Sequence, residues 1–305
     1  MKPDVKPGTE QQLNVEKKVV VRDTTKKAIA VVVLDVTDSM LTACNRYTRL
    51  DLLNMVVRYL YEGLIPIAKV RAALELAFVV FNEKVLLSTD FMSLTGATAE
   101  HFKSTDPDYQ DRVQLNRVMV TNADNYVFSC DVPTFDTATE DSGTMISTAV
   151  FHAVEKLQNR VTERAKHGSG CYAPFLIMVT DGHTDAEKGA DYADENEQKA
   201  VEMLKSHCST NHDPSNLIVP VVIGVGGEDI RSEALRAYSG GFVEGFFHVQ
   251  DQVSEKLIRV IASMICQSIT ASVTLNSEAV HDRLQELYEA THEEFRDIVN
   301  GYSSK

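Results

Sequence analysis

The chain has 305 residues, of which 44% are apolar, and its 30 basic and 44 acidic residues leave a formal net charge of −14. This length and apolar content are enough for one large hydrophobic core with appended elements. Because an acidic surface repels phosphate backbones and anionic lipid headgroups, we expect no nucleic-acid partner and no membrane surface. The chain also lacks a run of about 18 consecutive apolar residues, which argues against a membrane-spanning helix.

Residues 1–26 are polar and charged, and they predict an N-terminal arm outside the core. They lack the apolar centre of a secretory signal. The five cysteines are far apart, odd in number and without a C-x-x-C pair, which is typical of free thiols in a reducing compartment. We therefore expect a cytoplasmic protein.

From residue 28 onward, buried strands alternate with amphipathic helices. The stretch "AIAVVVLD" at 28–35 is apolar at nearly every position, as in a strand that is buried on both faces. Residues 48–68 then place leucines and valines at helical spacing. The alternation continues with strands at 72–82, 174–182, 217–226 and 245–249, and with helices at 148–165, 195–208, 230–239 and 253–269. It predicts an α/β fold with a doubly wound, mostly parallel central sheet and helices on both faces.

Two further segments extend this main domain, which we place at residues 27–270. Residues 91–140 form an acidic insertion, with ten acids against three bases over 90–141, and its segments 112–120 and 125–132 predict a strand pair joined by the turn "TNAD". Residues 271–305 predict an amphipathic helical tail that begins near Asn276 or Ser277. Its apolar face could dock on the chain's own domain or form a partner or dimer surface.

Polar side chains follow the predicted strands where ligands collect in an open parallel sheet. Asp35, Thr37 and Ser39 lie in "DVTDS", Asp181 lies in "TDGHTD", and Thr144 follows a glycine in "DSGTMIS" where a helix opens. Carboxylate and hydroxyl oxygens are hard donors that favour Mg²⁺ or Mn²⁺ over zinc. The sequence therefore predicts a site for a small hard cation.

The pattern D-x-T-x-S, followed by a threonine after glycine and an aspartate in T-D-G, resembles the metal-ion-dependent adhesion site (MIDAS) of von Willebrand factor A (vWA) domains. Thr37 stands where the family usually has serine, and Asp38 stands where bacterial members often have glycine. The resemblance implies that Thr37 and Ser39 bind the metal directly and that Thr144 binds directly or through water. It implies that Asp35 and Asp181 act through water and by orienting the hydroxyls.

Within the vWA family, "LDVTDSM", "VTDGHTD" and "ASMICQSITASV" look nearest to cytoplasmic bacterial proteins associated with tellurium resistance, the TerY type. That narrower likeness suggests a place in a stress-response system that includes kinases, phosphatases or ATPases.

A cation whose direct protein ligands are mostly neutral keeps excess positive charge, which attracts an acidic group from outside. We therefore expect a protein-interaction module without enzymatic activity that binds an Asp or Glu of a partner protein through Mg²⁺. Two alternatives remain. A Mg²⁺-dependent phosphatase of haloacid-dehalogenase type also has an Asp after its first strand, but its chemistry requires D-x-D-x-T, and Thr37 occupies the position of the second Asp. The other alternative is a structural subunit that assembles through the C-terminal helix.

Overall fold

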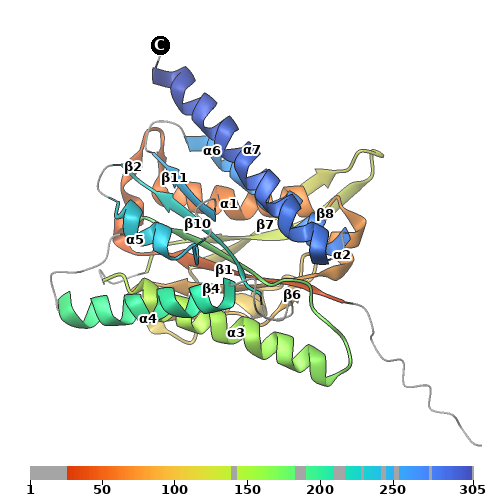
Figure 1. Ribbon diagram of the computed structural model, residues 1–305, viewed down its shortest axis with the longest axis horizontal. Helices are drawn as coiled ribbons and strands as arrows, with labels where there is room; N and C mark the ends of the chain where they lie inside the picture. The colour runs from red at the N-terminus through yellow and green to blue at the C-terminus, as the bar shows by residue number, and fades with distance from the viewer. Residues whose placement is uncertain are drawn as a thin grey trace, which may run out of the picture.

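The computed structural model describes residues 26–138, 143–182, 190–208, 217–227, 230–241, 245–250, 254–274 and 277–303. Its centre is a mostly parallel sheet with the strand order β11-β10-β9-β1-β4-β5, in which β6 also pairs with β4 (Figure 1). The strands are β1 (Ala28–Asp35), β4 (Leu74–Phe81), β5 (Val85–Ser88), β6 (Met92–Ser93), β9 (Phe175–Thr180), β10 (Val219–Val225) and β11 (Phe246–Val249).

Strand β1 lies at the middle of this sheet, parallel to β4 on one side and to β9 on the other. Strands β10 and β11 continue the parallel part, whereas β5 and β6 are antiparallel to β4. The register places Asp35 beside Phe81 and Leu34 beside Val179. The carboxyl ends of β4, β1 and β9 therefore meet at one edge of the sheet.

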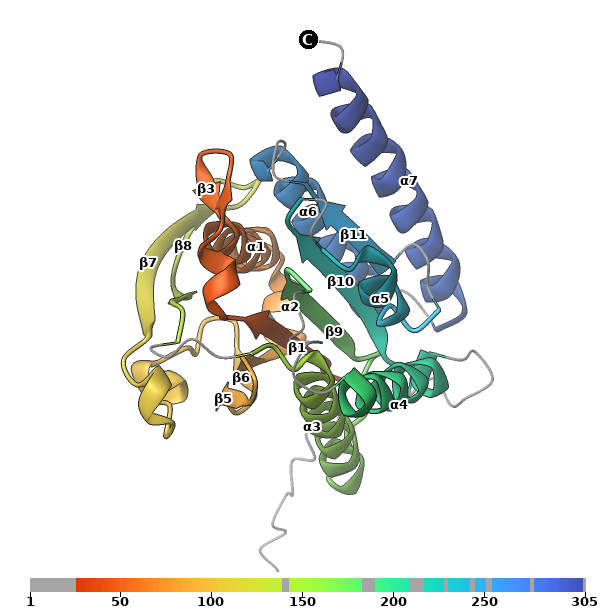
Figure 2. The same ribbon diagram turned by 90° about the vertical axis from the view of Figure 1, so that its left-hand side faces the viewer.

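Helices cover both faces of the sheet (Figure 2). The first face carries α1 (Arg49–Leu64), α2 (Ala68–Ala73) and α6 (Ser254–Thr274). The opposite face carries α3 (Ile146–Lys166) and α4 (Ala190–Cys208), and the short α5 (Ser232–Ala237) contacts β10 and β11. Alternate β1 side chains belong to two separate hydrophobic clusters, since Val32 lies in the cluster with α1 and Val33 in the cluster with α3. This explains why the β1 sequence is apolar at consecutive positions.

The helix predicted within residues 48–68 is α1, which ends four residues before that stretch does, and α2 was not predicted. Helix α1 ends at Leu64, and α2 begins at Ala68. Pro66 lies between them, and proline lacks the backbone N–H of a continuing helix and disfavours helical geometry in the residue before it.

Helix α6 packs between α1 and α7, and it contacts the sheet. Over Glu255–Thr274 it is long and apolar enough to cross a membrane by length and composition, the only such helix in the described part of the chain. However, 61% of its most apolar window is buried inside the protein, as in the core helix of a globular fold. All five cysteines are free, as predicted.

A long ribbon of two antiparallel strands, β7 (Val113–Thr121) and β8 (Val127–Phe135), stands beside the central sheet. It corresponds to the strand pair that the sequence predicts within residues 91–140. The β8 end of the ribbon is fixed to α1, because the Asn54 amide donates to the Phe135 carbonyl (2.9 Å) and accepts from the Phe135 N–H (2.8 Å).

The C-terminal segment is a single amphipathic helix, α7 (Ser277–Ser303), which begins at one of the two predicted residues. It docks on its own chain: Leu284, Leu287 and Tyr288 are buried and join the cluster of α6 and β11. The ring of Phe247 on β11 stacks on His292 at 4.7 Å between centroids. The side chains of Val280, Phe295 and Tyr302, which continue the same three-to-four-residue spacing, lie outside the described residues.

Candidate metal centre

The first part of the site is the loop that leaves β1. The Asp35 carboxylate accepts hydrogen bonds at Oδ1 from the Thr37 backbone N–H (3.1 Å) and from the Thr37 hydroxyl (2.7 Å). The Thr37 and Ser39 hydroxyl oxygens lie 2.9 Å apart, at the start of a short 3₁₀ turn over Asp38–Leu41. The Thr37 hydroxyl thus lies within hydrogen-bonding distance of both the Asp35 carboxylate and the Ser39 hydroxyl.

The second part is the end of β9, next to β1. The Thr180 hydroxyl donates to Asp35 Oδ2 (2.6 Å) and accepts from the Gly182 N–H (3.0 Å). Gly182 has a φ of +69°, and a Cβ there would lie 2.8 Å from the Leu235 side chain, so this turn requires glycine. These bonds place Asp181 beside Asp35, and both carboxylates are fully buried.

The pKa of Asp35 is raised from 3.8 to about 7. Burial is the main cause, because it penalises the charged form, and the negative charge of Asp181 adds to it. Hydrogen bonds from Thr180 and Thr37 oppose the rise. Among the described residues, the hydrogen-bond partners of Asp35 are all neutral. Its negative charge is therefore costly unless a cation lies nearby.

The third part is the segment before α3. The Met145 N–H donates to the carbonyl of Asn82 (2.9 Å), the residue after β4, and the Ala138 N–H donates to the carbonyl of Val36 (3.2 Å). Thr144, next to Met145, is buried. These backbone bonds hold Thr144 at the edge of the sheet that also carries Asp35 and Asp181. All five predicted metal-site residues thus lie at one edge.

Sequence reasoning did not identify Arg49, the first residue of α1. Its guanidinium lies 3.1 Å from Asp181 Oδ2, and only 1% of the residue is exposed. A cation in the first turn of a helix faces the positive end of the helix dipole. That unfavourable position is the sequence signal that could have singled it out.

Asp38 is exposed next to this centre, whereas His183, Thr184 and Asp185 lie outside the described residues. Within the described ranges, no group of three or more His, Cys, Asp or Glu side chains is arranged to hold a metal ion. Among the described residues of this edge, the other side-chain oxygens include the hydroxyls of Thr37, Ser39, Thr144 and Thr180.

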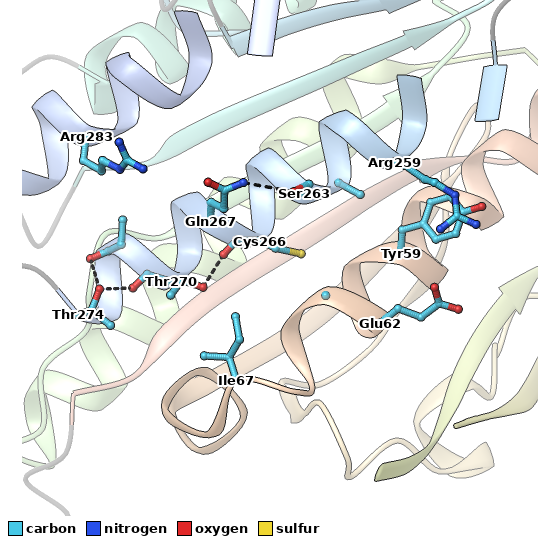
Figure 3. A pocket seen from close by; sticks show the side chains of 13 residues that line it. Tyr59, Glu62, Ile67, Arg259, Ser263, Cys266, Gln267, Thr270, Thr274 and Arg283 are labelled. Carbon is cyan, nitrogen blue, oxygen red and sulfur yellow. Dashed lines mark hydrogen bonds between the residues drawn. The ribbon is translucent and has the colours of Figure 1, made fainter. Parts of the chain in front are cut away.

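A groove of about 650 Å³ opens elsewhere, between α1, α6 and α7 (Figure 3). Its polar side chains are mostly engaged within their own helices: the Thr270 hydroxyl donates to the Cys266 carbonyl (2.6 Å), and the Thr274 hydroxyl donates to the Thr270 carbonyl (2.8 Å). It does not include the predicted site residues. The groove is therefore separate from the strand ends that carry the predicted site residues.

No protein-family model matches the chain, and no curated protein matches it significantly. Solved structures with a similar arrangement include proximal thread matrix protein 1 from the mussel byssus (15% identity, TM-score 0.42). They also include the pilus adhesin SpaC from Lactobacillus rhamnosus GG (11%, 0.48) and the vWF domain of a type V pilus tip protein from Porphyromonas gingivalis (12%, 0.42).

The match to the byssus protein covers 81% of this chain and 47% of that protein. The match to SpaC covers 81% of this chain and 31% of SpaC, and the match to the vWF domain covers 83% of this chain and 98% of that domain. The chain thus spans less than half the length of the first two. All three TM-scores lie below 0.5, so these likenesses assign neither a family nor a function to this chain.

Proposed function

We propose that this chain is a non-enzymatic interaction module that binds a carboxylate of a partner protein through a Mg²⁺ or Mn²⁺ ion held at the strand ends. The Thr37 and Ser39 hydroxyls would bind the ion directly, and Thr144 directly or through water. Asp35 and Asp181 would orient these hydroxyls and metal-bound waters. Once bound, the metal supplies an open coordination position for an anionic oxygen.

The spacing of the two hydroxyl oxygens carries the proposal. Adjacent ligands in an octahedron with metal–oxygen distances of about 2.1 Å lie about 3.0 Å apart. Thr37 Oγ1 and Ser39 Oγ lie 2.9 Å apart. Hydrogen bonds from the Thr37 and Thr180 hydroxyls hold the Asp35 carboxylate in place. Asp35 supplies the negative charge that a cation would offset. The pair of hydroxyls therefore fits two neighbouring positions of a hard divalent ion.

The donor set also agrees with binding rather than catalysis. Thr37 occupies the position at which a phosphatase of the haloacid-dehalogenase type needs a second carboxylate, and its hydroxyl is already bonded to Asp35. A threonine hydroxyl is a poor general acid or base at neutral pH. As part of the same proposal, the chain acts in the cytoplasm, in a stress-response or phosphorylation-linked system.

Calorimetric titration with Mg²⁺ tests the metal site. The wild type should bind Mg²⁺, and Thr37→Val should bind it at least a hundredfold more weakly. Thr42→Val is the matched control, because Thr42 is an exposed threonine of the same loop. Equal affinity of Thr37→Val and the wild type would contradict the proposed site.

Capture of a carboxylate is a second, separate step. Acetate added to the Mn²⁺-loaded protein should show enhanced proton relaxation, since a carboxylate bound to Mn²⁺ lies within a few ångström of the paramagnetic ion. EDTA should abolish the effect. Metal binding without any acetate relaxation would leave the site as a structural cation site and would overturn the interaction function.

A further inference from the structure

Among the described residues, Arg49 is the largest fully buried side chain, and it lies beside the proposed metal centre. Its Nη1 donates to Asp181 Oδ2 at 3.1 Å. On its other side the guanidinium packs against Gly226 at the end of β10, where a Cβ would lie 2.9 Å from Arg49 Cζ. The guanidinium therefore spans the ends of β9 and β10, and the absence of a side chain at position 226 makes room for it.

Three features make this arrangement costly for a purely structural residue. The guanidinium is removed from water, and Arg49 occupies the first turn of α1, where the helix dipole disfavours a cation. The third feature is its buried ion pair with Asp181, since such a pair seldom stabilises a fold more than apolar packing of equal volume does. An apolar side chain from α1 would fill the same space without these costs. The buried charge of Arg49 therefore points to a role in the electrostatics of the proposed metal site.

The charges at this edge have a simple consequence. Among the buried residues that the structure describes at this edge, Asp35 and Asp181 carry two negative charges when ionised, and Arg49 offsets one of them. A divalent cation at the hydroxyls then gives this buried group of side chains and metal one net positive charge. Without Arg49, the same ion would be fully neutralised by the two carboxylates.

We propose that Arg49 is a specificity-determining residue, a fixed internal cation that weakens metal binding and strengthens the capture of an external carboxylate by the loaded site. This inference rests on the proposed function. Arg49 competes with the metal for the charge of Asp181, and it leaves the bound ion dependent on an anion from outside. The occupant it selects is a carboxylate side chain or a C-terminal carboxylate of a protein, in preference to a neutral carbonyl or hydroxyl group.

Two affinities measured on the same variants should change in opposite directions. Mn²⁺ affinity is measured by electron paramagnetic resonance, and acetate affinity for the Mn²⁺-loaded protein is measured by proton relaxation. Arg49→Gln and Arg49→Met, two neutral variants, should bind Mn²⁺ at least tenfold more tightly and acetate at least fivefold more weakly than the wild type. Arg49→Lys keeps the charge and should stay within about threefold of the wild type in both.

Arg58→Gln is the matched control, because Arg58 is an exposed arginine of the same helix, paired with Glu62. It removes the same unit of charge from the chain and should change neither affinity. Thermal unfolding adds a second measurement, the difference in Tm between Mn²⁺ and EDTA. This difference can be measured even if the substitution lowers the stability of the metal-free protein. The Mn²⁺-induced rise in Tm should be larger for Arg49→Gln than for the wild type, since the metal would then offset the Asp181 charge that Arg49 offsets in the wild type.

The outcomes separate the two proposals. If the wild type binds no Mn²⁺, the metal site itself is wrong and the role of Arg49 falls with it. If the wild type binds Mn²⁺ and acetate and the neutral variants match it within twofold, the metal site stands and the inference about Arg49 is overturned. Weaker Mn²⁺ binding by Arg49→Gln and Arg49→Met would also overturn it, because that result identifies Arg49 as a structural support.

Discussion

The stability of the metal-free protein should depend on the charge of Asp35. In the unfolded chain this carboxyl titrates at its ordinary pKa of 3.8, and in the fold its pKa is about 7. The stability that the protonated group contributes is therefore fully present below 3.8 and has been lost once the pH has risen through about 7. Between these values, the stability that Asp35 contributes to the metal-free protein falls as the pH rises.

The size of this effect follows from the two pKa values. The raised pKa of Asp35 should lower the free energy of unfolding by roughly 2 kcal/mol at pH 5 and roughly 4 kcal/mol at pH 8, since each pH unit between the two pKa values is worth about 1.4 kcal/mol. Asp35→Asn removes the titration and keeps the shape of the side chain. The difference in unfolding free energy between wild type and Asp35→Asn should thus change by about 2–3 kcal/mol between pH 5 and pH 8.

Urea unfolding in EDTA, followed by circular dichroism at both pH values, measures this difference. The variant serves as the reference for the exposed acids of the chain that lie away from Asp35, because the substitution leaves their surroundings unchanged. Mg²⁺ should reduce the difference at pH 8 and have little effect at pH 5, where the proton competes with the metal. If the difference in unfolding free energy between the wild type and Asp35→Asn does not change with pH, the pKa of Asp35 is not raised and the reasoning is refuted.

Three further changes test the framework of the site and the docking of the tail. Thr180→Val removes the hydroxyl that bridges Asp35 and the Gly182 N–H, and it should lower the unfolding free energy by about 2–4 kcal/mol in urea at pH 8; Thr42→Val should change it by less than about 0.5 kcal/mol. Gly226→Ala should cost about 2 kcal/mol or more, because φ is +151° and the new Cβ would lie 2.5 Å from Ile230 Cγ2; a neutral effect in the same assay would show that the β10 turn is not close-packed. Leu287→Ala should lower the free energy of unfolding by about 2–4 kcal/mol, because Leu287 is buried where α7 docks. Glu294→Ala, at an exposed position of the same helix, should lower it by less than about 0.5 kcal/mol. Equal values for the two variants would mean that the tail is not docked in solution.

Much of the fold was predictable because its strands and helices differ in hydrophobic period. A strand such as β1, covered on both faces, is apolar at consecutive positions, while α7 repeats its apolar residues every three or four positions. The short strands β2 (Ala43–Cys44), β3 (Tyr47–Thr48) and β6 were not predicted. A pair of residues carries no period, so such strands form only through their partners in the folded chain.

The site was predictable in part for the same reason. Residues that follow parallel strands must meet at one edge, which is why Asp35 and Asp181 could be paired from the sequence. Arg49 could not be found in this way, because its burial depends on contacts with two loops that are 132 and 177 positions away along the chain. Thr180 was visible in the sequence, but its hydrogen bond to Asp35 follows from the β1–β9 register.

The central claim is that the hydroxyls of Thr37 and Ser39 are two neighbouring ligands of one divalent cation. An anomalous difference map from crystals grown with Mn²⁺ tests it most directly. The account predicts one strong peak at the strand ends, about 2.2 Å from both hydroxyl oxygens, with Asp35 and Asp181 close behind them. A map without a peak there, or with Mn²⁺ bound only to acidic side chains elsewhere on the surface, would contradict it.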